Sequence, residues 1–102
     1  MRVPHWEQGR QGTGYRKLRL AQGKHWDLYV LDLPAGINVP THTDVVPGRQ
    51  HWRASFVLCG EQSLQVDGAI RLGRLVVFRP DRPHSLPVLG RRRIELSFGV
   101  AL

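Results

Sequence analysis

The sequence holds a single cysteine, Cys59, among 102 residues. One cysteine excludes a disulfide within the chain and a cysteine-based zinc site, and it fits a reducing compartment, so we expect a cytoplasmic protein. No apolar run approaches the roughly 18 residues that a membrane-spanning helix needs. The first seven residues also lack the apolar segment of a secretory signal. We therefore expect no association with a membrane.

A helical period is missing as well, because no stretch places apolar residues at intervals of three and four. Residues 51–59 and 93–100 instead alternate apolar and polar side chains, which is the period of a strand with one buried face. The dipeptide Asp67-Gly68 favours a tight turn, and it predicts a hairpin between residues 63–66 and 69–72. The patterns predict an all-β protein with little or no helix.

Eight or nine short strands, separated by turns, are typical of a small antiparallel β-sandwich. The jelly roll, or double-stranded β-helix, is its common eight-stranded form, and we expect about eight antiparallel strands here. A length of 102 residues allows one domain, so the prediction is a single jelly roll over residues 1–102. Residues 1–14 are polar and rich in glycine, which predicts a loosely ordered lead-in.

Negative charge is scarce, with 8 acidic against 15 basic residues and a net charge of +7. This balance favours anionic partners such as nucleic acid, an acidic protein or a carboxylate metabolite. A solvated basic surface explains the same charge without any partner. Nucleic-acid binding is therefore kept as an alternative that the sequence does not favour.

The residues with the clearest chemistry are two histidines and an aspartate. His42 and Asp44 are two positions apart, so on an extended strand both side chains leave the same face. His84 follows forty residues later, at the start of a late strand. Two imidazoles and one carboxylate on one side of a metal form the facial triad of non-haem Fe(II) oxygenases. A chance His-x-Asp pair and a surface His84 are the alternative explanation.

Arg93 follows His84 by nine residues, about one short hairpin away. A guanidinium that points into a protein interior needs an anion, and its fork matches a carboxylate. The carboxylate of a co-substrate beside the metal is one such anion. The alternative is that Arg91, Arg92 and Arg93 form one solvated run of charge.

Taken together, the segments 40–44, 78–85 and 90–98 resemble the core of the 2-oxoglutarate/Fe(II)-dependent oxygenases, in their prolyl-hydroxylase-like and aspartyl/asparaginyl-hydroxylase-like branches. The resemblance covers roughly residues 26–102. It implies a double-stranded β-helix that hydroxylates a peptide side chain or a small molecule, with release of succinate and CO2.

By this resemblance, His42, Asp44 and His84 would be the catalytic ligands of Fe(II), and Arg93 would bind the distal carboxylate of 2-oxoglutarate. A tyrosine that often contacts the co-substrate has no counterpart, and Arg53 or Ser55 would take its place.

Two other functions stay open. One is a cupin-type metalloprotein that has the same fold and metal but does not use 2-oxoglutarate. The other is a non-catalytic basic β-module that binds an anionic partner through its arginine-rich edge.

A homodimer is the last expectation, and it follows from a surplus of apolar faces. If Arg93 and its alternate neighbours face the interior, then Ile94, Leu96, Phe98 and Val100 face outward. These side chains would give a monomer a contiguous apolar patch of several hundred Å², which soluble monomers seldom tolerate. We therefore expect a second copy of the chain to cover it.

Overall fold

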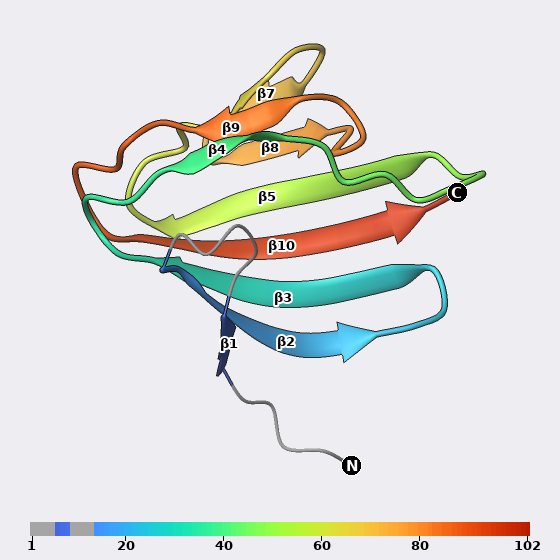
Figure 1. The fold of residues 1–102 in the computed structure, drawn as a ribbon, viewed down its shortest axis with the longest axis horizontal. Helices are drawn as coiled ribbons and strands as arrows, with labels where there is room; N and C mark the ends of the chain where they lie inside the picture. The colour runs from blue at the N-terminus through green and yellow to red at the C-terminus, as the bar shows by residue number, and fades with distance from the viewer. Residues whose placement is uncertain (1–5, 9–13) are drawn as a thin grey trace.

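The computed structural model describes residues 6–8 and 14–102, which form ten β-strands and no helix. The strands make two antiparallel sheets that lie as two layers (Figure 1). This confirms the predicted all-β, antiparallel jelly roll. The strands are β1 (Trp6–Gln8), β2 (Arg16–Gln22), β3 (Trp26–Leu33), β4 (Val39–His42), β5 (His51–Cys59), β6 (Gln65–Val66), β7 (Ile70–Leu72), β8 (Leu75–Phe78), β9 (His84–Leu86) and β10 (Arg93–Ala101).

The larger sheet has the strand order β1-β2-β3-β10-β5-β8-β7, and the smaller sheet has the order β4-β9-β6. The last strand, β10, lies between β3 and β5, so the end of the chain completes the centre of the larger sheet. In the smaller sheet β4 pairs with β9, and His42 stands opposite His84. Residues forty positions apart in sequence thus become neighbours. No helix within the described residues is long and apolar enough to cross a membrane.

The predicted hairpin at Asp67-Gly68 is wrong. Gly68 does have the positive φ of a tight turn, at 75°. However, β6 pairs with β9 in the smaller sheet, whereas β7 pairs with β8 in the larger sheet. The turn is therefore a corner at which the chain passes from one layer to the other. The residues of the turn suit a hairpin and a corner between sheets equally well, so only the pairing of β6 and β7 with distant strands distinguishes the two.

The predicted lead-in, residues 1–14, falls largely outside the described residues, because 1–5 and 9–13 are not described. Within it, residues 6–8 form β1, which pairs with β2 so that Glu7 lies opposite Lys17. This short strand lies at one edge of the larger sheet, beside β2 (Figure 1).

The core lies between the two sheets, where each contributes alternate side chains. Strand β10 shows the alternation most clearly, since Arg93, Glu95 and Ser97 are buried while Phe98 is 44% exposed. The predicted division of its two faces is therefore confirmed. The buried apolar cluster comprises Tyr15, Leu33, Val39, Leu64, Val76, Phe78, Leu86 and Leu89.

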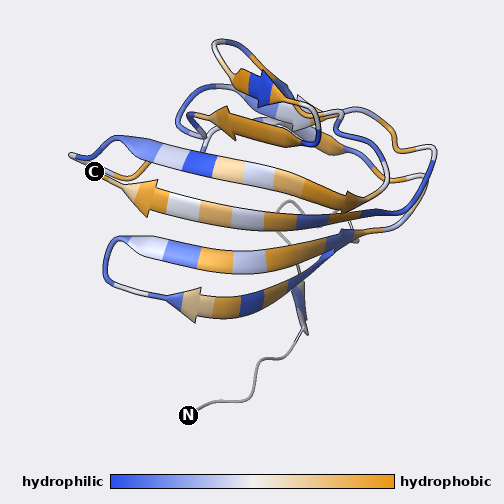
Figure 2. Cartoon of the chain, turned by 180° about the vertical axis from the view of Figure 1, so that it is seen from behind, coloured by the Kyte–Doolittle hydropathy of each residue, from blue (hydrophilic) through white to orange (hydrophobic). Residues whose placement is uncertain are grey.

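The outer face of the larger sheet carries two rows of apolar side chains that run across neighbouring strands, and we call it the outer apolar face. Hydrophobic segments recur along its central strands in Figure 2. Phe56 and Phe98 are 42% and 44% exposed, so no other described part of the chain covers the middle of this face. One row contains Leu18, Val30, Leu96, Phe56 and Leu75, and the next contains Leu28, Phe98, Ala54 and Val77.

One end of the outer apolar face holds a compact ion-pair cluster. The carboxylate of Asp32 accepts two hydrogen bonds from Arg92, at 2.8 and 2.9 Å, and one from Arg16 at 2.7 Å. The bonds from Arg92 are the main reason that the pKa of Asp32 falls to about 2, against the opposing effect of its burial; Arg16 lowers it further.

Acid should therefore destabilise the fold through Asp32. Its folded pKa of about 2 lies below the ordinary 3.8, so its contribution is fully present above pH 4 and is lost as pH falls toward 2. Asp32→Asn should lower the urea midpoint at pH 7, and the gap to wild type should close near pH 2. Asp67→Asn, at an exposed turn, is the matched control. A gap that does not change with pH would contradict the assignment.

Candidate functional site

The two histidines of the predicted triad lie on adjacent strands of the smaller sheet. His42 ends β4 and His84 begins β9, and the centroids of their rings are 4.3 Å apart. Asp44 was expected on the same strand as His42, but β4 ends at His42 and Asp44 lies in the loop beyond it. The backbone N–H of Asp44 donates to the carbonyl of Pro80 at 2.7 Å. This bond holds the loop against the segment that precedes His84.

The donor atoms of the three residues converge on one point. Oδ2 of Asp44 is 3.5 Å from Nε2 of His42 and 3.4 Å from Nε2 of His84. One ligand atom from each residue lies within 4.8 Å of the other two. Two ligands at about 2.1 Å from an ion, at angles between octahedral and tetrahedral, are roughly 3.0–3.5 Å apart. The separations therefore fit a single metal ion.

The other nitrogen of each ring is held by the backbone. Nδ1 of His42 donates to the carbonyl of Pro40 at 2.8 Å, and Nδ1 of His84 donates to the carbonyl of Arg82 at 2.9 Å. A carbonyl oxygen only accepts, so each ring donates from Nδ1, and its Nε2 is the nitrogen that faces the carboxylate of Asp44. Metal-binding histidines are commonly oriented by such bonds. The donor set fits Fe(II) and similar divalent ions, since it contains no thiolate.

The surroundings of His84 favour positive charge. Burial disfavours its imidazolium, but the hydrogen bond to the Asp44 carboxylate and the carbonyl of Arg82 outweigh burial and raise the pKa of His84. The Asp44 carboxylate that stabilises the imidazolium would also attract a divalent ion, which would have to displace the proton from Nε2 of His84.

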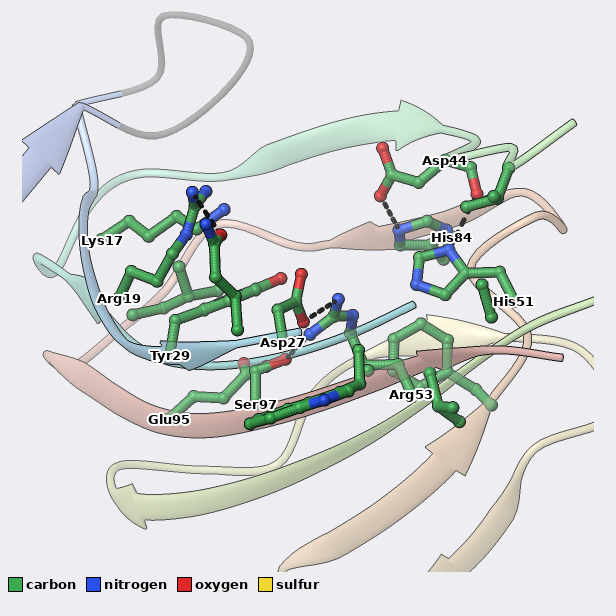
Figure 3. A pocket seen from close by; sticks show the side chains of 18 of the residues that line it. Lys17, Arg19, Asp27, Tyr29, Asp44, His51, Arg53, His84, Glu95 and Ser97 are labelled. Atoms are coloured by element: carbon green, nitrogen blue, oxygen red, sulfur yellow. Dashed lines mark hydrogen bonds and ion pairs between the residues drawn. The ribbon is translucent and has the colours of Figure 1, made fainter. Parts of the chain in front are cut away.

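His51 borders the triad, although the sequence favoured a surface or strand-edge position for it. Its Nδ1 donates to the backbone carbonyl of Asp44 at 3.1 Å, and its ring lines the same cavity (Figure 3). His51 begins β5 and shares the inward face with Arg53, two positions on. That alternation was the available signal, but only the fold shows that this end of β5 approaches the loop after β4.

A cavity of about 570 Å³ lies between the two sheets and contains the triad. His42 and His84 of the smaller sheet line one side of it, and inward-facing side chains of β2, β3, β5 and β10 line the other. Figure 3 shows Asp44, His51 and His84 at one end of the cavity, with Lys17 and Arg19 at the other.

Arg53, which was predicted to contact a co-substrate, lies on the cavity wall formed by β5. Its guanidinium donates to Asp27 and to Ser97, each at 2.8 Å, and lies 4.6 Å from the ring centroid of Tyr29. Gly99 of β10 makes room for it, because a Cβ at position 99 would overlap the guanidinium. Arg53 is thus held in place by the protein's own groups at the base of the cavity.

Ser55, the other residue predicted to contact a co-substrate, is fully buried and does not line this cavity. Gln62 lies beside it, with Nε2 of Gln62 3.4 Å from the Ser55 hydroxyl.

Tyr29 lines the cavity between Arg53 and Lys17, whose ammonium lies 4.1 Å from the ring centroid. Burial raises the pKa of Tyr29 to about 12, although the charge of Arg53 and a hydrogen bond with Ser97 oppose the change. At neutral pH this residue is therefore a hydroxyl group and not a phenolate.

Arg93 points into the interior, as predicted, and is 1% exposed. Its guanidinium forms an ion pair with Glu95 and donates to Gln62 at 2.7 Å and to the carbonyl of Glu61 at 3.2 Å. Glu95 lines the cavity of the triad, but Arg93 does not. The anion that Arg93 meets is therefore a side chain of the same strand. The alternation along this strand predicted that Glu95 faces the interior together with Arg93, but sequence reasoning gave Glu95 no role in the site.

No family model matches the chain, and no curated protein matches it. Solved structures do: a RmlC-like cupin from Shewanella frigidimarina aligns with a TM-score of 0.71 and 21% identity, over 96% of this chain and 83% of that one. KdgF from Halomonas sp. aligns with a TM-score of 0.71 and 13% identity, over 96% and 86%. The DMSP lyase DddQ from Ruegeria pomeroyi aligns with a TM-score of 0.70 and 19% identity, over 95% and 56%. At these identities the likeness establishes the cupin fold.

Proposed function

We propose that this cupin-fold chain is a metal-dependent enzyme whose centre is held by His42, Asp44 and His84. The observation that carries the proposal is the convergence of two Nε2 atoms and one carboxylate oxygen at 3.4–3.5 Å. Backbone carbonyls fix both rings with Nε2 directed to that point. Three ligands on one side leave the cavity side of an ion open to a small molecule.

The proposed chemistry is the activation of a small substrate by the metal. A bound divalent ion would act as a Lewis acid that polarises an oxygen of the substrate. The chain's own residues would bind and orient that substrate within the cavity of about 570 Å³. Tyr29 offers a hydroxyl at neutral pH, so its role is to donate a hydrogen bond and not to act as a base. The DMSP lyase and KdgF have the same fold, which is compatible with an enzyme.

Hydroxylation with 2-oxoglutarate is the more specific candidate, and it needs a cation to bind the distal carboxylate of that co-substrate. Arg93 was the predicted clamp, yet its guanidinium is satisfied by Glu95 and Gln62 and lies outside the cavity lining. Arg53 does line the cavity, but Asp27 already pairs with it. Both arginines predicted to bind the co-substrate are therefore already paired, and the cations Lys17 and Arg19 lie at the end of the cavity opposite the triad (Figure 3). For this reason we favour a metal centre that works without 2-oxoglutarate.

An anaerobic titration of the apoprotein with Fe(II), with and without 2-oxoglutarate, tests the metal centre and tests whether 2-oxoglutarate binds to it. We expect one equivalent of Fe(II) per chain, measured by metal analysis after gel filtration. We expect no new visible absorption band on addition of 2-oxoglutarate, because the chelate that gives the band would not form.

A visible band in the presence of 2-oxoglutarate would show that the co-substrate binds the metal. It would overturn the preference for a centre without 2-oxoglutarate and restore the oxygenase assignment. Failure to retain Fe(II), Mn(II) or Zn(II) at a stoichiometric level would overturn the metal centre itself. The basic β-module that binds an anionic partner would then be the better explanation of the net charge of +7.

A further inference from the structure

The cavity has room for more than the ligands of a metal. Its volume of about 570 Å³ lies within the range of small-molecule pockets, roughly 300–1,000 Å³. The triad is at one end, and Lys17 and Arg19 of β2 reach the other end (Figure 3). A small molecule held at the triad can therefore extend toward β2, and the charges at that end decide what kind of molecule it is.

Three carboxylates that line the cavity are already compensated. Asp27 pairs with Arg53 at 2.8 Å, and Glu95 pairs with Arg93. Asp44 belongs to the triad, where a divalent ion more than balances its single charge. None of these three groups is left to attract a cationic substrate.

The cations at the β2 end are balanced less completely. Lys17 lies over the ring of Tyr29, and Glu7 of β1 is its partner in the strand register. Arg19 is exposed, and within the described part of the chain its guanidinium donates to the neutral side-chain amide of Gln22 at 2.9 Å. One carboxylate thus faces two cations, and this end of the cavity keeps a positive charge.

We infer that Lys17 and Arg19 form an anion-binding wall, and that the substrate of the metal centre proposed above is a small organic acid. The planar fork of Arg19 can bind a carboxylate through two parallel hydrogen bonds, and Lys17 adds a second positive charge beside it. An oxygen-bearing group at the far end of the same molecule then faces the triad. The inference rests on the proposed function for its metal end and on β2 for its acid end.

Calorimetric titration of Zn(II)-loaded protein with succinate and with neutral succinamide measures how much more tightly the cavity binds the anion. The two probes have the same length and differ in charge, so we expect wild type to bind succinate at least about tenfold more tightly, a ratio that corresponds to ~1.4 kcal/mol. The double variant Lys17→Gln/Arg19→Gln should lose about that factor for succinate and show no change for succinamide. Equal affinity of wild type for the two probes would overturn the inference.

Arg91→Gln is the matched control, because Arg91 is exposed and lies outside the lining of this cavity. It should bind succinate as wild type does. A loss as large as that of the double variant would assign the effect to net charge and would also overturn the wall.

Two further readouts separate this inference from the proposed function. Zinc is measured in every preparation, and the double variant should retain it, because neither β2 residue belongs to the triad. If no preparation retains a metal, the proposed centre fails, but the wall is still tested with apoprotein. Apoprotein should then bind succinate more tightly than succinamide. Equal affinity of the apoprotein for the two probes would contradict the anion-binding wall as well.

Discussion

Replacement of His42, Asp44 or His84 by alanine is expected to abolish stoichiometric metal binding, with a loss of affinity well above a hundredfold. Changes to residues that only orient metal ligands cost about 10–100-fold, and removal of a ligand itself should cost more. The three donor atoms lie within 4.8 Å of one another, so each supplies one of the three contacts that the described residues offer to an ion. Equilibrium dialysis against Zn(II), with metal analysis of the retained protein, measures the effect.

His25→Ala is the control for this experiment. His25 also lines the cavity but is not part of the triad, so its replacement should leave metal binding unchanged. Circular dichroism of each variant should match wild type, because none of the three ligands belongs to the buried apolar cluster, although the ring of His84 contacts it at Phe78. Full metal content in the three alanine variants would show that the triad is not the metal site.

A second copy of the chain is the proposed cover of the outer apolar face, and Phe56→Glu is expected to dissociate the resulting homodimer. The five strands that carry the apolar rows are between four and nine residues long and, at about 3.3 Å per residue and ~4.8 Å between strands, present roughly 600 Å². Stable interfaces bury about 800 Å² on each partner, so this face is of comparable size. Phe56 lies beside the central residue of one row, Leu96, and is 42% exposed in the single chain, so a charge there should harm the interface more than the fold.

Light scattering at low micromolar concentration measures the state of assembly. Wild type should give twice the chain mass of 11.6 kDa, and Phe56→Glu should give that mass itself. Val88→Glu is the control, because Val88 is 69% exposed and lies in the loop between β9 and β10, away from the outer apolar face. A monomeric wild type would refute the dimer, and a dimeric Phe56→Glu would place the interface elsewhere.

The predictions from sequence succeeded where the period of a strand decides the outcome. The alternation in residues 93–100 placed Arg93 inward and Phe98 outward, as the structure has them. The donor atoms of His42 and Asp44 also lie close together, but Asp44 is in the loop beyond the end of β4 and is held there by the carbonyl of Pro80. The strand period therefore accounts for the faces of β10 and does not account for the position of Asp44.

The predictions failed where the partner comes from a distant part of the chain. Nothing local tells that β6 pairs with β9 and not with β7, because the turn at Asp67-Gly68 serves either arrangement. Lys17 and Arg19 looked like ordinary surface cations until β2 was placed at the wall of the cavity. The neighbours of Arg93 include Gln62, thirty-one residues away, and this pairing depends on β5 and β10 being adjacent.

The contact between Arg53 and Gly99 predicts how these two positions vary together among related sequences. A methyl group at position 99 would occupy the place of the Arg53 guanidinium, so the guanidinium would have to move away from its ion pair with Asp27. A shorter residue at 53 vacates that volume first and makes a later side chain at 99 easier to accommodate. Sequences with a side chain at 99 should therefore lack the arginine at 53 more often than they keep it.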